Sequence, residues 1–486
     1  MKGPKLLLLI VILLTPLLAS AISAQTTYRA YLPGVNSPAT PTIFGFETIL
    51  GKLSDTTVRA HAAELGATWV RINGLRWDEI EPVQGGGYSA AALTLLDSDL
   101  KAAGELGLTA TVIVHGAPAW AQEIANTRCG PIRSDALDDF AKFMSDMVTR
   151  YSYPPYNVTY WELGNEPDAP YIGAAGSTTS TMPYGCWGDP NRPDYNGGAY
   201  ATMLAAVYPA IKAANPNAQV IIGGLLYGCV PGSNCGNSEP YKSSAFLDGV
   251  LSAGGGAYFD IFAYHSYPFW ADPNSASNED WDIAGTGNPW APYGGLLQGK
   301  LSFIRQTLAA YGLQQKPIIM NEGALLCYES AARCGPDGFE DDKASYAIRL
   351  FARSSANRLL GSFYYTLDGP GWQDAGLLDG SQQPRPAFTA LKHMISLVGK
   401  SQGAATNVTA EYGSASDIEA YRFNRGSDRV DVIWKIRSIT TSTISLPASK
   451  FISATTSQGS AITPLTVGSS VTLDVGFMPI YIVRQP

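Results

Sequence analysis

Short apolar segments alternate with helical patterns over residues 41–398, and this alternation is the feature that most limits the fold. The predicted strands are Thr42–Phe46, Trp69–Asn73, Thr109–His115, Val158–Gly164, Val220–Leu225, Ile261–His265, Ile318–Asn321 and Ser362–Thr366. The clearest helical patterns are Ala90–Leu106, Ser134–Tyr151, Tyr200–Ala214 and Leu301–Tyr311. Repeated strand–helix units favour parallel strands, so we expect an α/β fold, a closed (β/α)8 TIM barrel. An open doubly wound sheet is the alternative, but no glycine-rich phosphate loop follows the first strand.

The pattern changes after residue 398. The β-rich runs there are Ile418–Phe423, Val430–Trp434, Ser442–Leu446 and Val471–Val483, with Asn, Gly and Ser clusters and no helix between them. Short strands separated by turn residues are typical of an antiparallel sandwich. We therefore expect residues 399–486 to form a small β-sandwich accessory domain beside the catalytic barrel.

The first 24 residues have the order of a secretory signal peptide. Lys2 and Lys5 precede the apolar run Leu6–Leu14, and small residues follow at Ala19–Ala24, with cleavage expected after Ala21 or Ala24. The alternative is an uncleaved anchor, but the apolar core is shorter than the roughly 20 residues that a spanning helix needs. We expect a secreted, extracellular protein in which residues 25–40 are a lead-in to the barrel.

Charge and composition narrow the class of partner. Charged residues make up 15% of the chain, against roughly 25% in an average soluble domain, while 26 tyrosines and 10 tryptophans are present. Signal cleavage takes away two of the 33 basic residues and none of the 41 acidic ones, which moves the net charge from −8 to −10. This charge argues against nucleic acid or an anionic membrane as partner. A neutral, aromatic surface suits an uncharged ligand such as a sugar.

Six cysteines fit an oxidising compartment. Proximity along the chain predicts the disulfides Cys229–Cys235 and Cys327–Cys334, which leaves Cys129 to pair with Cys186. No CxxC pair occurs and the chain holds only four histidines, so a zinc site has little support. We expect the disulfides to stiffen loops around the site.

Two glutamates carry the chemistry that the sequence suggests. Glu166 and Glu322 each follow an asparagine at the end of an apolar strand, the fourth and the seventh. The carboxyl ends of these strands face each other across a barrel mouth, where barrel active sites lie. One carboxyl can protonate a glycosidic oxygen while another attacks the sugar, and a separation of about 5 Å gives retention. The alternative is that each glutamate only caps a loop.

These residues resemble a known signature. Trp161–Pro167 is similar to the fourth-strand Asn-Glu-Pro signature of clan A of the glycoside hydrolases, and strand-end matches extend over residues 41–398. Trp77 with Glu81-Pro82, together with the added β-sandwich, makes family 39 and its neighbours the nearest resemblance. The resemblance implies that Glu166 is the general acid/base and Glu322 the nucleophile.

Other residues at the strand ends are expected to bind substrate: Arg71, His115, Trp120, Asn165, His265, Tyr267 and Trp372. Asn165 can bond a sugar 2-hydroxyl, and the resemblance favours Tyr267 as a donor to the nucleophile. Arg71 would keep Glu322 ionised; its alternative role is as a structural partner of Glu162.

His265 and His115 are predicted to bind sugar hydroxyls, although a histidine on a strand is often a satisfied core residue. Trp120, Trp161 and Trp372 are placed to give the site apolar walls, with ordinary core as the alternative for each. Trp161 is expected to point partly away from the site, and Trp372 to be the floor of the subsite next to the scissile bond. The long segments after the fourth and sixth strands add Trp187, Trp270, Trp281 and Trp290, which either line a cleft or pin these loops to the barrel.

The sequence thus predicts a monomeric, secreted, retaining O-glycosidase, with Glu166 and Glu322 as its catalytic pair and no metal or cofactor. Its substrate is an oligo- or polysaccharide, with a neutral β-linked glycan favoured by the aromatic loops. Two alternatives remain. One is a catalytically silent carbohydrate-binding barrel, and the other is a metal-dependent barrel hydrolase with clustered His and Asp ligands.

Overall fold

A computed structural model describes residues 42–170, 185–228, 230, 243–270, 281–284, 289–327, 334, 336–412, 417–436 and 440–486. Its first eight strands form one parallel sheet in the order β5-β4-β3-β2-β1-β8-β7-β6. They are β1 Phe44–Ile49, β2 Trp69–Arg76, β3 Thr109–His115, β4 Tyr160–Asn165, β5 Gln219–Gly224, β6 Phe262–Ser266, β7 Ile318–Gly323 and β8 Ser362–Tyr364. Parallel bridges between Ile221 and Ile261 and between Leu225 and Tyr264 close the ring. The predicted TIM barrel is confirmed.

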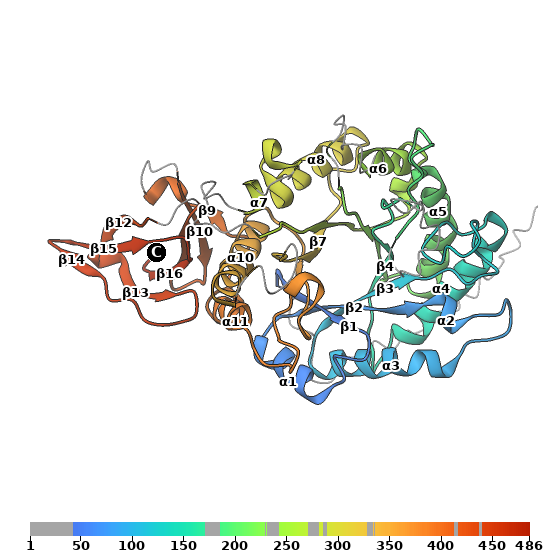
Figure 1. Ribbon diagram of the computed structural model, residues 1–486, viewed down its shortest axis with the longest axis horizontal. Helices are drawn as coiled ribbons and strands as arrows, with labels where there is room; N and C mark the ends of the chain where they lie inside the picture. Colours follow the sequence, from blue (N-terminus) through green and yellow to red (C-terminus); the bar gives the residue numbers. More distant parts are fainter. Residues whose placement is uncertain are drawn as a thin grey trace, which may run out of the picture. The chain divides into compact units, whose positions relative to one another are not determined.

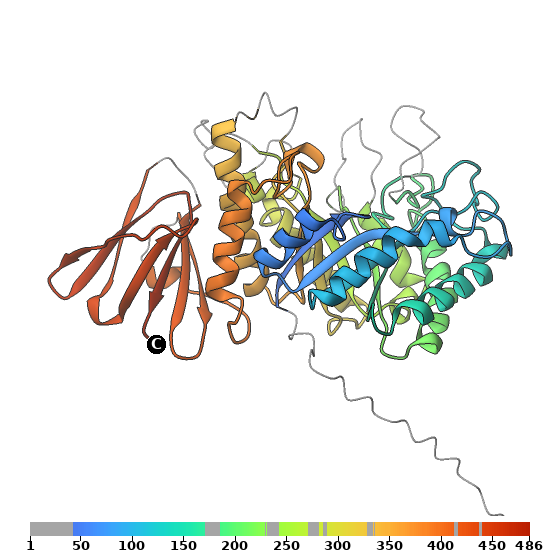
Figure 2. The same ribbon diagram turned by 90° about the horizontal axis from the view of Figure 1, so that it is seen from below.

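Helices surround this ring (Figures 1 and 2). They are α1 Thr56–Leu65, α2 Trp77–Ile80, α3 Ala90–Glu105, α4 Leu137–Tyr151, α5 Gly197–Ala214, α6 Ser243–Ser252, α7 Trp281–Ala284, α8 Gly295–Ala310, α10 Pro336–Ala356 and α11 Pro386–Val398. The sequence of α4 shows why they form. Its buried residues Phe140, Phe143, Met144 and Met147 recur at helical spacing, so the helix has one apolar face for the strands. None of the described helices is long and apolar enough to cross a membrane.

A separate apolar cluster lies among the first halves of the strands. It contains Trp69, Ile221, Ile261, Ala263, Ile319 and Phe363, and all six are buried. Gly45 of β1 leaves room for it, because a Cβ at this position would come within 3.0 Å of Trp69 and 2.9 Å of Phe363. Bulky side chains therefore fill one end of the barrel, and the polar residues gather at the carboxyl ends of the strands.

Two antiparallel sheets follow the barrel, as predicted. One has the strand order β13-β16-β11-β10-β9 and the other β12-β15-β14. The strands are β9 Thr406–Asn407, β10 Ile418–Asn424, β11 Arg429–Lys435, β12 Ser442–Pro447, β13 Phe451–Thr456, β14 Leu465–Val467, β15 Ser470–Val475 and β16 Ile480–Arg484. The prediction of one run over Val471–Val483 was wrong. Residues 476–479 end in a proline, which has no backbone N–H, and they divide the run into strands of different sheets.

Helix α10 joins the barrel to these sheets. The Arg353 guanidinium donates to both carboxylate oxygens of Glu419 on β10, at 3.0 and 2.6 Å, and both residues are buried. One turn earlier, Arg349 lies over the Phe477 ring, 4.0 Å from its centroid, and donates to the carbonyl of Phe477. The barrel and the C-terminal sheets therefore share a buried interface, and α10 and α11 lie between them in both views (Figures 1 and 2).

Candidate active site

Arg71 stands at the centre of the polar residues at the carboxyl ends of the strands. Glu47 on β1 pairs with Arg71 on β2 in the sheet register, and both side chains are buried. The Arg71 guanidinium contacts three carboxylates, those of Glu47, Glu162 and Glu322. It also donates from Nη2 to Asn165 Oδ1 at 2.7 Å. One cation thus ties together four strands, β1, β2, β4 and β7, so both roles predicted for Arg71 occur together.

Glu162 is held by four donors. Arg71 reaches it with Nε at 2.9 Å and Nη2 at 2.7 Å. Asn321 Nδ2 donates at 2.7 Å and the Gly224 backbone N–H at 3.2 Å. Because a carboxylate is an acceptor only, this full set of donors stabilises its ionised form.

Glu322 is contacted by side chains from β2, from β6 and from the residue after β6. The Tyr267 hydroxyl donates to its Oε2 at 2.6 Å, Arg71 Nη1 contacts Oε1, and His265 Nδ1 lies 3.3 Å from Oε2. Burial alone would raise the pKa of Glu322. The charges of His265 and Arg71 and the two hydrogen bonds outweigh it and hold the pKa below the usual 4.5. Glu322 is therefore an ionised carboxylate over the working range of most enzymes.

Glu166 sits on a tight turn after β4. Its backbone has a φ of 49°, and its N–H donates to the Gly224 carbonyl at 3.0 Å. The side chain is 21% exposed, and its Oε1 lies 2.8 Å from His265 Nδ1. Carboxylate oxygens of Glu166 and Glu322 lie within 4.8 Å of each other. Two carboxyl groups that are about 5–5.5 Å apart are the arrangement of retaining glycosidases.

Gly224 of β5 lies directly beneath this pair. A Cβ there would overlap His265 Nε2 and come within 2.6 Å of Asn321 Oδ1. Its N–H serves Glu162 and its carbonyl serves Glu166. A side chain at this position would therefore have to displace the side chains of His265 and Asn321, which explains the glycine.

Glu166, His265 and Glu322 have donor atoms within 4.8 Å of one another, a spacing that a metal ion could also span. The donors already on Glu322 do not fit that role. Arg71 occupies one of its oxygens and Tyr267 the other, and a buried cation beside the set would repel a second one. We assign no metal to these residues.

The structure brings Arg71, Asn165, His265 and Tyr267 together around the two glutamates. His265 contacts the carboxylates, rather than standing apart as a ligand for sugar hydroxyls. His115, the last residue of β3, contacts Asn73 of β2 instead, with its Nε2 at 2.7 Å from Asn73 Oδ1.

Trp372 lies at the rim, 51% exposed, with its ring edge-on to Tyr267 at a centroid distance of 6.0 Å. Trp120 packs edge-on against Trp77 and donates to the Glu81 carbonyl at 3.2 Å, so its contacts support the segment after β2. Trp161 points away from the site, as expected, and is part of the core. It is fully buried and faces Tyr151 of α4, because alternate residues of a strand point to opposite sides and its neighbour Glu162 points inward.

Two roles were predicted for the loop tryptophans, lining a cleft or pinning a loop to the barrel, and three of them have the second role. Trp187, Trp281 and Trp290 are at most 7% exposed. The Trp290 indole donates to the Tyr227 carbonyl at 2.9 Å, and Trp281 packs edge-on against Phe477. They pin long loops, because a large ring gains more from burial than from exposure at a rim.

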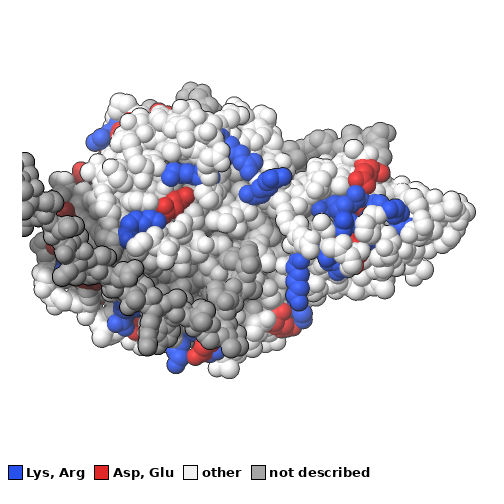
Figure 3. Space-filling view, turned by 180° about the vertical axis from the view of Figure 1, so that it is seen from behind, with Lys and Arg blue, Asp and Glu red and all other residues white. Residues whose placement is uncertain are grey.

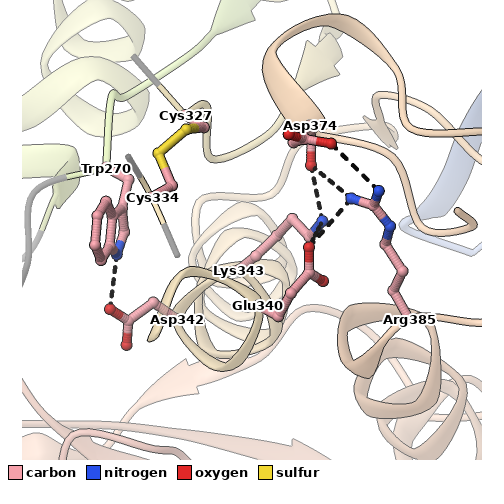
Figure 4. The surroundings of a disulfide bond; sticks show 8 residues. All are labelled: Trp270, Cys327, Cys334, Glu340, Asp342, Lys343, Asp374 and Arg385. Carbon is pink, nitrogen blue, oxygen red and sulfur yellow. Dashed lines mark hydrogen bonds and ion pairs between the residues drawn. A yellow bond between two sulfur atoms is a disulfide. The ribbon is translucent and has the colours of Figure 1, made fainter. Parts of the chain in front are cut away.

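Trp270 is half-buried and is held from α10, where Asp342 Oδ2 accepts its indole N–H at 2.8 Å (Figure 4). Lys343, the next residue of α10, contacts a second loop, the one that carries Trp372. Its Nζ donates to Glu340 at 2.9 Å and to the carbonyls of Asp374 and Gly376 at 2.8 and 3.2 Å. Arg385, the residue before α11, donates to the Asp374 carbonyl and carboxylate, both at 3.2 Å. The loop that carries Trp372 is therefore fixed by buried and half-buried charges.

Two of the predicted disulfides are present, Cys129–Cys186 and Cys327–Cys334. The second lies beside the Trp372 loop (Figure 4), where the Cys327 N–H donates to the Gln373 carbonyl at 2.9 Å. The predicted pair Cys229–Cys235 lies outside the described residues.

Sequence reasoning did not assign Glu47 and Asn321 to the site. Glu47 follows Phe46 at the end of a predicted strand, and Asn321 precedes Glu322, so both were in strand-end positions. For Glu47 the sequence did hold a signal, its charge at the end of a buried strand, since a buried carboxylate needs a cationic partner.

Comparisons with known proteins agree with this geometry. A model of the family described as cellulase, glycosyl hydrolase family 5, matches residues 35–286, just over half of the chain. This range includes Glu166 and ends before Glu322. A search of curated proteins finds no match.

Solved structures share the fold. A family 39 glycoside hydrolase from the gut symbiont Bacteroides cellulosilyticus has a TM-score of 0.65 at 20% identity, covering 92% of this chain and 81% of that one. A family 39 β-xylosidase from Caulobacter crescentus gives 0.58 at 13% identity, with coverages of 92% and 98%. A family 30 endoxylanase from Clostridium papyrosolvens gives 0.58 at 12% identity, with coverages of 93% and 98%.

The barrel, the opposed glutamates and the family match lead to one assignment. The chain belongs to the cellulase family, glycosyl hydrolase family 5, within clan A of the glycoside hydrolases.

Proposed function

We propose that the protein is a retaining glycosidase in which Glu322 is the nucleophile and Glu166 the general acid/base. The observation that carries this proposal is the distance between the two carboxylates, whose oxygens lie within 4.8 Å of each other. An inverting enzyme needs roughly 6.5–9.5 Å between its carboxyl groups to admit a water molecule.

The surroundings of the two glutamates support this division of roles. Glu322 receives Arg71, Tyr267 and His265, so it is held as an anion that can attack the anomeric carbon. Glu166 is the more exposed of the two, so its carboxyl group can reach both the leaving oxygen and the incoming water, as an acid/base must. In the first step Glu166 gives its proton to the leaving oxygen while Glu322 forms the glycosyl ester. In the second step Glu166 takes a proton from the water that hydrolyses this ester.

Asn165 and Trp372 are the proposed sugar contacts. Arg71 donates to Asn165 Oδ1, so the amide NH2 of Asn165 is the group that can donate to a sugar 2-hydroxyl. The half-exposed Trp372 ring stands edge-on to Tyr267, whose hydroxyl reaches the nucleophile. A sugar stacked on Trp372 would thus lie next to Glu322.

We further propose that the protein is secreted and acts on a neutral, β-linked glycan. The N-terminal signal pattern and the two disulfides support secretion. Charged side chains are sparse on the face in Figure 3, and blue and red groups occur side by side there. The low share of charged residues, 15% of the chain, favours an uncharged substrate.

The test is hydrolysis of aryl β-glycosides and polysaccharides by the wild type and by two alanine variants. Panels should begin with xylosides and glucosides, since structural neighbours are named as a β-xylosidase, an endoxylanase and a glucosidase. Glu322→Ala should be inactive, and added azide should give a glycosyl azide of inverted configuration. Glu166→Ala should keep activity only on substrates with good leaving groups, and azide should then give the retained configuration. Full activity of Glu322→Ala on a cleaved substrate would contradict the proposal.

A further inference from the structure

We propose that Glu47 carries a proton at neutral pH and serves as a positioning residue for Glu322. The effect of Glu47 on the reaction rests on the proposed function, whereas the proton on Glu47 does not. Its basis is a charge imbalance, because one buried guanidinium, that of Arg71, contacts three buried carboxyl groups. Leaving all three ionised would bury a net negative charge, and the low-dielectric interior makes this costly.

The number of donors decides which group holds the proton. Glu162 has four, two from Arg71 and one each from Asn321 and the Gly224 N–H. Each of these donors requires an oxygen lone pair. A proton on Glu162 would displace at least one of them, so Glu162 is ionised.

Glu322 has three contacts that favour the anion. They come from Arg71 Nη1, from the Tyr267 hydroxyl at 2.6 Å and from His265 Nδ1 at 3.3 Å. Burial of Tyr267 raises the pKa of its hydroxyl, and the negative charge of Glu322 adds to this, so the hydroxyl stays a donor. Glu322 is therefore ionised as well.

Glu47 is different. Within the described part of the chain, its carboxyl group accepts a hydrogen bond from one donor, Arg71 Nη1, the same nitrogen that contacts Glu322. The side chain is 4% exposed, so little water is available to replace the missing donors.

The titratable groups around Glu47 are Arg71 from β2, Glu162 from β4, Tyr267 after β6 and Glu322 from β7. Burial raises the pKa of Glu47 well above 4.5; Arg71 opposes this shift, and Glu322 and Glu162 add to it. The small number of donors and the neighbouring negative charges thus both favour a raised pKa for Glu47.

A neutral Glu47 leaves the positive charge of Arg71 to Glu162 and Glu322. If Glu47 were ionised, it would place a second negative charge next to the nucleophile and compete for Arg71 Nη1. The charge on Glu47 would raise the pKa of Glu322 and would move the Glu322 carboxylate away from Arg71. Glu47 thus acts through Arg71 to keep the nucleophile ionised and in place.

Infrared difference spectroscopy tests the protonation without any substrate. A protonated carboxyl has a carbonyl stretch that an ionised one lacks. Because the acid role proposed for Glu166 requires a proton on that group too, the comparison uses Glu166→Gln and Glu166→Gln/Glu47→Gln at pH 7.5. We expect the double variant to lose one carbonyl band, and in Glu166→Gln that band should disappear as the pH is raised. Identical carbonyl regions in the two proteins would overturn the proposal.

A matched pair of isosteric variants gives a second measurement. Glu47→Gln replaces a neutral group and should lower Tm by less than about 3 °C, whereas Glu162→Gln removes an ionised partner of Arg71 and should lower it by on the order of 10 °C. Equal losses would contradict the assignment of the proton. The outcome is independent of azide rescue in Glu322→Ala, so failure of the proposed function would be seen separately.

Discussion

The Tyr267 hydroxyl donates a 2.6 Å hydrogen bond to Glu322 Oε2, and the Tyr267 ring meets the edge of Trp372 at a centroid distance of 6.0 Å. One side chain therefore contacts both the proposed nucleophile and the proposed sugar platform. The bond is made to a charged acceptor, which makes it stronger than one between neutral groups. Its orientation depends on the position of the Trp372 loop.

Tyr267→Phe should reduce kcat/KM by about 10- to 100-fold, because a hydrogen bond to a charged group contributes about 1.5–3 kcal/mol. The loss of this donor also removes one of the effects that lower the pKa of Glu322. We expect the acidic limb of the wild-type kcat/KM profile below pH 4.5, and in Tyr267→Phe it should move to higher pH. Tyr208→Phe is the control, since its hydroxyl bonds Asp260 at 2.9 Å away from the site. An unchanged acidic limb in Tyr267→Phe would contradict this role.

Lys343→Met should change the dependence of stability on pH. Burial lowers the pKa of Lys343 from 10.5 to about 8. Between these values the unfolded chain binds more protons at this group than the folded protein does. Wild-type stability should therefore rise with pH across this window, by up to ~3 kcal/mol relative to Lys343→Met. The free energy of unfolding from urea titrations between pH 7.5 and 10.5 measures it. A constant difference between the two proteins over that range would show that Lys343 does not titrate there.

The same variant should also affect substrate binding, because Lys343 donates to two carbonyls of the Trp372 loop. We expect KM to rise several-fold while kcat changes less, as lost uniform binding does. Lys392→Met is the matched control, since Lys392 is 46% exposed and pairs with Glu64 on the surface. If kcat fell as much as kcat/KM and KM stayed constant, the loop would act in the transition state alone.

Removing the two described disulfides should have unequal effects on stability. Cys129–Cys186 spans 57 residues and Cys327–Cys334 spans 7. In the chain-entropy model these loops correspond to about 4 and about 2 kcal/mol of stabilisation. Paired Cys→Ser variants and their free energies of unfolding would show this order. A larger loss from the shorter loop would indicate that the disulfide acts on the folded Trp372 loop rather than on the unfolded chain.

Glu419→Gln should destabilise the contact between the barrel and the C-terminal sheets by about 1.5–3 kcal/mol, because it weakens the two hydrogen bonds that the buried Arg353 donates to a charged carboxylate and leaves Asp282, at 3.7 Å, as its other anionic contact. Near-ultraviolet circular dichroism and calorimetry should show one transition in the wild type and a broadened or split one in the variant. Arg353→Met/Glu419→Gln should recover part of the loss. Additive losses in the double variant would show that the two residues are not energetically coupled.

The sequence predicted the ring of strands well, because strand length, helix length and order are local properties. It also predicted that Glu166 and Glu322 would meet, since both follow strand ends and the carboxyl ends of parallel strands share one side of a barrel. Both glutamates could therefore be found from their places along the chain.

What the sequence could not give was the sharing of partners. The contacts of Arg71 with Glu47, Glu162 and Glu322 join positions up to 251 residues apart, and their geometry depends on how the barrel closes. The roles of the loop tryptophans stayed open for a similar reason. Whether an indole in a loop faces a cleft or the core depends on the packing of the loop, as the burial of Trp281 against Phe477 shows.

Gly224 sets a limit on how this enzyme can be redesigned. A library that randomises the residues around the carboxylate pair should return glycine alone at this position, since even alanine would displace His265 or Asn321. Substitutions on β5 therefore cannot reshape the pocket for a bulkier sugar. Diversity has to enter through the rim, where Trp372 is half-exposed and its neighbours belong to loops.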